Sequence, residues 1–228
     1  MTSDSNAPGA PAIYLYRQVD RDDALGEETN YVRLKILTAE GLKYASVEIP
    51  FSEGFESIHD IEARVIRPDG TANIFRGSVS DKAIGSARGV RQMAKSFTLP
   101  DVQVGSVVEY RYVTYYKECV RADACGFAGG QSHLTGTLNT SQWVLSKTLF
   151  TRKAQFSLRT LSAFSVRWNL PAGLPGGAKP PKVVDGGGRK TWVGSDDTSV
   201  IRMDVEAVPA ISTSNPTEYT VRFVYSWD

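Results

Sequence analysis

Both cysteines of the chain and one of its two histidines lie close together in the sequence. Cys119, Cys125 and His133 fall within the stretch KECVRADACGFAGGQSHLTG. Residues of these types can form a thiol nucleophile with its base, a set of metal ligands, or a loop closed by a disulfide. Which of these chemistries applies depends on the elements that hold the three side chains.

The surroundings of this group disfavour catalysis and metal binding. A cysteine nucleophile needs a lowered pKa, usually from a helix N-terminus or a partner histidine, and a third group that orients that histidine. The stretch is rich in glycine, and we expect no helix in it. Structural zinc prefers cysteines about two to four positions apart, and VRADA separates the pair here. We therefore predict no catalytic, metal-binding or cofactor-binding residues. A thiol hydrolase that uses Cys119 or Cys125 with His133 is the less favoured alternative.

The rest of the chain is dominated by an alternation of apolar and polar residues, which is typical of half-buried strands. In YVRLKIL, Val32, Leu34 and Ile36 share one face, and Arg33 and Lys35 share the other. The same pattern recurs at residues 59–65, 107–116, 164–170, 200–207 and 219–227. This distribution predicts an all-β fold, a large, elongated antiparallel β-sandwich whose sheets each bury one face.

Turn residues separate the predicted strands. AEGL and PDGT place Gly41 and Gly70 between strands, and we expect Asp69 to accept a hydrogen bond from the backbone two residues on. The best candidate for a short helix is residues 79–94, although two glycines interrupt it. We predict a flexible lead over residues 1–12, a single β-sandwich domain over 13–228, and a loop insertion at 118–140.

The overall composition excludes some classes of partner. Lys and Arg total 26 and Asp and Glu total 25, so the net charge is +1, and we expect no nucleic-acid partner. No apolar run approaches the ~20 residues of a membrane span. The N-terminus lacks the basic and apolar regions of a signal peptide.

Three stretches resemble a known family. They are YVRLKILTAEGLKYASVEIPFSEGFESIHDIEARVIRPDGT at 31–71, FTLPDVQVGSVVEYRYV at 97–113 and WVLSKTLFTRKAQFSL at 143–158. The most specific parts are KILTAEG, the R-x-x-x-PDG motif and the P-x-V-x-x-GSVVEY motif. In this order they resemble a bacterial family of unknown function, the domain that precedes transglutaminase-like domains.

The resemblance implies a role and a location. Such proteins are usually exported, so we expect a periplasmic or secreted protein. The domain is similar in architecture to the β-sandwich that begins zinc aminopeptidases, without their zinc site. The transglutaminase-like module, with its papain-type Cys-His-Asp triad, would follow Asp228, so no triad residue falls in this chain. The chain is then a non-catalytic accessory domain, and its partner is the neighbouring transglutaminase-like domain or another polypeptide.

Export would also decide the state of the cysteines. In an oxidising compartment we expect a Cys119–Cys125 disulfide worth about 2 kcal/mol, with free buried thiols as the alternative. Tyr115 lies on the charged face of its strand and Trp192 lies near a turn. A glycan- or peptide-binding module that uses these two rings as a platform is the alternative function.

Overall fold

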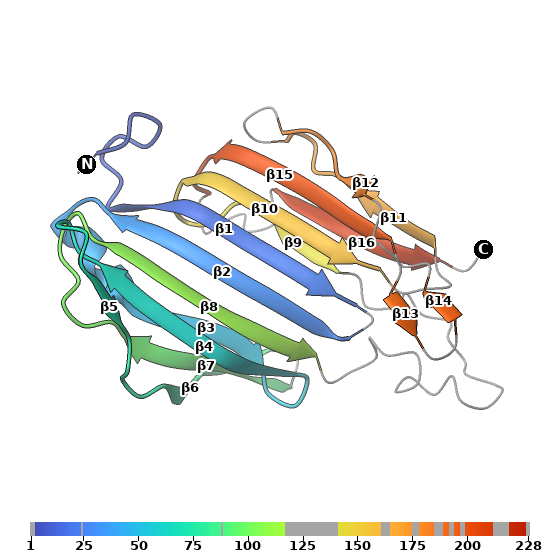
Figure 1. Ribbon diagram of the computed structural model, residues 1–228, viewed down its shortest axis with the longest axis horizontal. Helices are drawn as coiled ribbons and strands as arrows, with labels where there is room; N and C mark the ends of the chain where they lie inside the picture. The colour runs from blue at the N-terminus through green and yellow to red at the C-terminus, as the bar shows by residue number, and fades with distance from the viewer. Residues whose placement is uncertain are drawn as a thin grey trace.

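The computed structural model describes residues 3–23, 25–87, 89–116, 141–160, 165–174, 178–184, 189–191, 194–196, 199–211 and 219–226. In these ranges the chain consists of β-strands and one short 3-10 helix, joined by turns. Nearly all the strand pairs are antiparallel, and the strands form a layered, sandwich-like arrangement (Figure 1). The prediction of an all-β antiparallel sandwich is confirmed.

The elements follow one another along the chain in a simple order. The first half contains β1 (Ala12–Asp22), β2 (Glu27–Ile36), the 3-10 helix η1 (Ala39–Ala45), β3 (Ser46–Ser52), β4 (Glu56–Ile66), β5 (Ala72–Ile74), β6 (Ser80–Ala87), β7 (Val90–Thr98) and β8 (Val107–Tyr116). The second half contains β9 (Gln142–Val144), β10 (Thr151–Arg159), β11 (Ser165–Asn169), β12 (Lys182–Val184), β13 (Arg189–Thr191), β14 (Gly194–Asp196), β15 (Val200–Val208) and β16 (Thr220–Ser226).

One large sheet combines strands from both halves. Its eight strands are ordered β12-β15-β10-β1-β2-β8-β4-β5. The two halves meet at β1 and β10, which pair in parallel, with Tyr14 opposite Thr151 and Val19 opposite Phe156. A strand from the start of the chain therefore lies in the middle of the sheet, and the edges are the two short strands β5 and β12.

Two smaller sheets cover one face of the large sheet. The sheet β3-β7-β6 packs on β4 and β8, and the sheet β11-β16-β9 packs on β10 and β15 (Figure 1). Directly opposed residues share a face, and the row Ala154–Arg17–Val32–Tyr110–Ala63 runs from one covered region to the other. Both cores therefore lie on the same side, which we call the inner face.

The two cores are built from alternate residues of the strands. The core under β9 and β16 contains Trp143, Phe156, Met203 and Phe223, and the Trp143 and Phe223 rings meet edge to face at 4.4 Å. The core under β3 and β7 contains a second set of buried side chains: Val47, Ile49, Ile58, Val65, Phe97 and Val108. The predicted alternation thus supplies the apolar side of each layer.

Buried polar side chains tie the layers together. Arg17 on β1 donates to the carbonyls of Leu145, at 2.9 Å, and Val144, at 3.1 Å. Asp23, which directly follows β1, accepts hydrogen bonds from Ser141 and from the hydroxyl of Tyr225, and it pairs with Arg21. A buried charge needs such partners, because it has lost its hydration.

The predicted turn at Asp69 and Gly70 is present, whereas Gly41 and residues 79–94 adopt structures other than those predicted. The backbone N–H of Thr71 donates to Asp69 at 2.8 Å, as predicted, and Gly70 has the positive φ of 90° that favours glycine. Gly41 lies in η1 instead of a tight turn. The suggested helix at 79–94 is wrong, because this segment forms parts of β6 and β7, and Gly85 takes up a register shift between them.

The N-terminal lead is held against the sandwich from residue 3 onward. Asp4 is 3% exposed and accepts a hydrogen bond from Arg152 at 2.5 Å. Ala7 and Ala10 pack against a small cluster of Ile13, Leu37 and Phe150. Residues 4–10 thus contact the sandwich, and the flexible lead over residues 1–12 stays a prediction. The predicted insertion at 118–140 lies outside the described residues.

Acid should release this segment. The hydrogen bond from Arg152 lowers the pKa of Asp4 below its ordinary value of 3.8. The stabilisation is therefore complete above that value and is lost as the pH falls through the depressed pKa. We expect Asp4→Asn to lower the free energy of unfolding at pH 7, and the difference from the wild type to vanish in strong acid. Urea unfolding over a pH series measures this, and a pH-independent difference would contradict it.

Gly41 is predicted to tolerate no side chain. A Cβ at this position would lie 2.1 Å from the carbonyl oxygen of Pro11, which accepts hydrogen bonds from Leu37 and Thr38. We expect Gly41→Ala to destabilise the fold by about 1–3 kcal/mol, the usual effect of overpacking, as measured by urea unfolding. Gly173→Ala is the control, because a Cβ there meets open space. Equal stabilities of the two variants would contradict the packing argument.

Candidate functional site

The face of the large sheet opposite the two cores, the outer face, carries a row of charges across three neighbouring strands. Arg33 on β2 lies opposite Glu109 on β8, and Glu109 lies opposite Arg64 on β4. Alternation along each strand points these side chains away from the apolar cores. The pleat and the register of the strands therefore place one carboxylate between two guanidinium groups.

Glu109 is the buried centre of this row. It is 2% exposed, although it lies on the face that neither smaller sheet covers. It forms ion pairs with Arg33, at 3.1 Å, and with Arg64, whose side chain is half exposed. The hydrogen bond to Glu109 raises the pKa of Arg64 above its ordinary value. We call Arg33, Glu109 and Arg64 the charge row.

A second row lies beside the charge row on the same strands. Tyr31, Arg111 and Glu62 are opposed across β2, β8 and β4, and Arg111 pairs with Glu62 at 3.7 Å. Burial raises the pKa of Tyr31, and the nearby charge of Glu109 adds to the effect. The phenol therefore stays protonated, and Glu62, whose side chain is 71% exposed, forms the outer rim.

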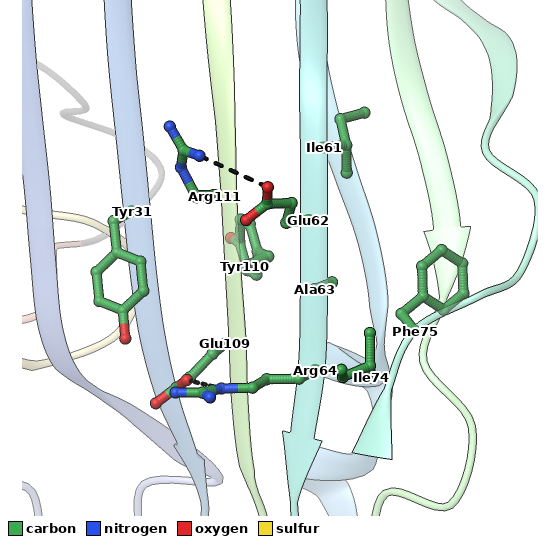
Figure 2. Close-up of a pocket in the computed structure, with 10 residues that line it drawn as sticks. All are labelled: Tyr31, Ile61, Glu62, Ala63, Arg64, Ile74, Phe75, Glu109, Tyr110 and Arg111. Carbon is green, nitrogen blue, oxygen red and sulfur yellow. Dashed lines mark hydrogen bonds and ion pairs between the residues drawn. The ribbon is translucent and has the colours of Figure 1, made fainter. Parts of the chain in front are cut away.

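The members of these two rows, apart from Arg33, line a depression of about 500 Å³. Figure 2 shows the charged side chains of β8 and β4 on one side of it and the apolar side chains of Ile74 and Phe75 on the other. The lining residues are Tyr31, Ile61, Glu62, Ala63, Arg64, Ile74, Phe75, Glu109, Tyr110 and Arg111. Ile74, in the edge strand β5, is 68% exposed. The depression thus joins a charged floor to an apolar rim.

The residues that the sequence singled out are placed elsewhere. Cys119, Cys125, His133 and Trp192 lie outside the described residues, so the predictions of a disulfide and of a two-ring platform stay predictions. Tyr115 lies on the outer face as expected, opposite Ser57. Its ring contacts His59 edge to face at 5.2 Å.

Ser57 and His59 offer a hydroxyl next to an imidazole. Ser57 Oγ and His59 Nε2 are 3.0 Å apart, which is the reach of a nucleophile and its base. In the part of the chain that the structure describes, no carboxylate is hydrogen bonded to His59 to orient it, and the pair is exposed to water. The contact is therefore explained as a hydrogen bond between neighbours on one strand face.

The described ranges show neither a cluster of metal-ligand side chains nor a helix that could cross a membrane. Within them, no three or more His, Cys, Asp or Glu side chains gather as metal ligands. Their only helix is η1, and no helix in the described ranges has the length and hydropathy to cross a membrane.

Comparison with known families decides where this fold belongs. A family model described as a domain of unknown function with solved structure matches residues 22–211, which is most of the chain. The chain belongs to the DUF3857 family. The part of the predicted resemblance that concerns a domain of unknown function is thereby confirmed.

A solved structure shares the fold of this DUF3857 domain. It is the crystal structure of a "putative protease" from Parabacteroides distasonis, with a TM-score of 0.64 and 14% sequence identity. The match covers 96% of this chain and 40% of that protein. The chain thus spans well under half the length of that protein. No curated protein matches the chain.

The charge row of this DUF3857 domain was not recognised from the sequence. Alternation placed Glu109 and Arg111 on a charged face, and Arg33 and Arg64 on the charged faces of other strands. The missing information was the strand order, because β2, β8 and β4 are distant in sequence and adjacent in space. Had the strand order been known, the register would have placed Arg33, Glu109 and Arg64 opposite one another on neighbouring strands.

Removal of the central carboxylate should destabilise the domain. Glu109→Gln leaves two guanidinium groups facing an uncharged amide, and we expect a loss of about 2 kcal/mol in the free energy of unfolding. Glu62→Gln is the matched control, since Glu62 also pairs with an arginine but is largely exposed; we expect a change below about 0.5 kcal/mol. Urea unfolding at pH 7 compares the two. Similar effects would show that burial of Glu109 does not matter.

Proposed function

We propose that the chain is a non-catalytic accessory domain of an exported bacterial protein, which binds and positions a neighbouring transglutaminase-like domain or another polypeptide. Membership of the DUF3857 family and the resemblance of its motifs to domains that precede transglutaminase-like modules support this role. The proposal concerns binding, because the charged side chains that line the depression are paired with one another.

The observation that carries the proposal is the outer-face depression. Its charges are already neutralised in pairs, Arg64 with Glu109 and Arg111 with Glu62, so they offer hydrogen bonds without a large cost of desolvation. Next to them Ile74 exposes most of its side chain. A floor of paired charges with an apolar contact at its rim is typical of protein–protein interfaces.

The comparison with the Parabacteroides distasonis protein gives a second, independent argument for the accessory role. The matched region makes up 40% of that chain, so the fold occurs there beside a larger remainder. That protein is described as a "putative protease". By analogy we place catalysis in a neighbouring module and recognition in the domain described here.

Two measurements test this function. The purified chain is expected neither to hydrolyse casein nor to incorporate an amine donor into it. Activity that disappears with Cys119→Ser would overturn the proposal in favour of a thiol enzyme. This arm needs no knowledge of the partner.

The second arm tests docking with matched edge variants. The polypeptide that the gene encodes after Asp228 is expressed separately, and its binding to the chain is measured by calorimetry. We expect Ile74→Asp to weaken binding at least tenfold, because it places a charge in the apolar rim. Val183→Asp is the control, since Val183 is a 59% exposed aliphatic residue in the opposite edge strand, β12. Equal effects of the two variants, or no binding by the wild type, would contradict the proposed docking surface.

A further inference from the structure

Strand β4 has an open edge along most of its length. Strand β5 pairs only with Arg64, Val65 and Ile66, and the last contact is a hydrogen bond from Phe75 N–H to the carbonyl of Ala63 (Figure 1). From Glu56 to Glu62, β4 pairs with β8 on one side. Among the described residues no strand pairs with it on the other side.

The register shows which backbone groups point to that open side. The carbonyl of Ala63 faces β5, so Glu62 and Arg64 face β8. A bulge adds one extra residue to β4 between His59 and Glu62. Beyond the bulge the pairing with β8 resumes, with His59 opposite Val113. Because N–H and C=O alternate in direction along an antiparallel strand, the groups of Ile58 face outward.

Two depressions follow one another along this edge. The first is the outer-face depression beside Ile61–Arg64. The second, of about 210 Å³, lies beside Glu56–His59 and is closed on its other side by residues of β3, β6 and β7. Phe51, Ile58 and Met93 give the second depression an apolar lining. We call the two depressions together the edge groove.

The two ends of the edge groove differ in charge. The second depression is lined by Glu53, Glu56 and Asp81 and by Lys95 and His59. Lys95 pairs with Asp81 at 2.8 Å and Arg91 pairs with Glu53 at 3.7 Å, so among the described residues Glu56 is the acidic residue that remains without an ion pair there. In the first depression, Arg64 and Arg111 balance Glu109 and Glu62. Arg33, beside it, adds a positive charge. Because β5 already pairs with Arg64 to Ile66, a segment on the open edge would run from Glu62 to Glu56. It would meet a net acidic end at Glu56 and the balanced charges of the first depression at its other end.

We propose that the edge groove binds an extended polypeptide segment as an added strand, antiparallel to β4, with apolar side chains directed inward and a lysine or arginine near its C-terminal end. An antiparallel segment continues the direction of β5, and its C-terminal end lies at Glu56, where the acidic residues gather. Strand addition would pair the outward backbone groups of Ile58 on the side where no described strand pairs with β4. This inference rests on the proposed binding function and specifies the chemistry of the segment.

The bulge in β4 explains why this edge does not pair indiscriminately. Asp60 has a φ of 51°, a conformation that is uncommon outside glycine, at the point where the register shifts. A bulge interrupts the ladder and protects an edge from aggregation. A bound segment must therefore gain affinity from the two depressions as well as from backbone hydrogen bonds.

The test uses a defined probe, the blocked peptide acetyl-Glu-Thr-Val-Thr-Val-Thr-Lys-amide, titrated into the isotope-labelled chain and followed by amide chemical shifts and hydrogen exchange. We expect a dissociation constant on the order of 1 mM. We also expect shifts concentrated in β4 and slower exchange at Ile58. The same peptide with Glu and Lys exchanged is expected to bind more weakly, because its charges oppose those of the groove.

A charge reversal tests whether the acidic residues beside Glu56 contribute to binding of the probe. Glu53→Lys should weaken binding of the probe about fivefold, the effect of one exposed ion pair. Glu206→Lys is the matched control, because Glu206 is an exposed glutamate on the distant strand β15. It pairs with Lys153 at 3.8 Å, which is close to the 3.7 Å between Glu53 and Arg91. This control substitution should leave the affinity unchanged.

The outcomes separate this inference from the proposed function. No binding at several millimolar probe, shifts away from β4, tighter binding of the charge-exchanged peptide, or equal effects of the two variants would overturn the edge groove. The proposed function would survive any of these results if the calorimetric arm with Ile74→Asp succeeded. Failure of both experiments would overturn both.

Discussion

The parallel ladder between β1 and β10 is the constraint on which the rest of the molecule depends. The edge of β1 that faces away from β10 pairs with β2. The edge of β10 that faces away from β1 pairs with β15. Without the ladder the large sheet would separate into two smaller sheets, each with its own cover and core. Arg17 reinforces the junction, because it leaves β1 to donate to carbonyls of Val144 and Leu145. A guanidinium group is suited to this position, since its several donors can be satisfied by backbone oxygens even when it is buried.

A sheet of this width needs a different solution on each face. The inner face is covered twice, and its apolar side chains form the two cores. The described layers leave the outer face without a cover, so its side chains must satisfy one another laterally. The charge row is the clearest case, because the buried Glu109 pairs with an arginine on each neighbouring strand. The same lateral pairing makes the outer face a surface on which a partner meets few unsatisfied charges.

The sequence allowed the type of fold to be predicted, but not its connections. Alternation in residues 31–37 and 107–116 identified β2 and β8 and assigned their faces correctly, because burial acts on every second residue of a strand. The segment 79–94 failed this method because every residue of β6 is exposed, so no apolar face marks it as a strand. Tyr115 was assigned to the correct face, whereas the buried state of Glu109 depended on neighbours that local pattern does not reveal. The long-range pairing of β1 with β10 has no signature in either strand alone.

The central position of β1 has a consequence for synthesis. Tyr14 leaves the ribosome well before its partner Thr151, because strands β2 to β9 are made between them. Until then β1 presents a bare edge, while β2 to β8 can already assemble on its other side. Contacts of such long sequence separation form slowly, and an exposed edge in the meantime favours pairing with other chains. The domain therefore passes through a half-formed sheet during its synthesis. The yield of folded protein then depends on keeping partly folded chains from aggregating with one another.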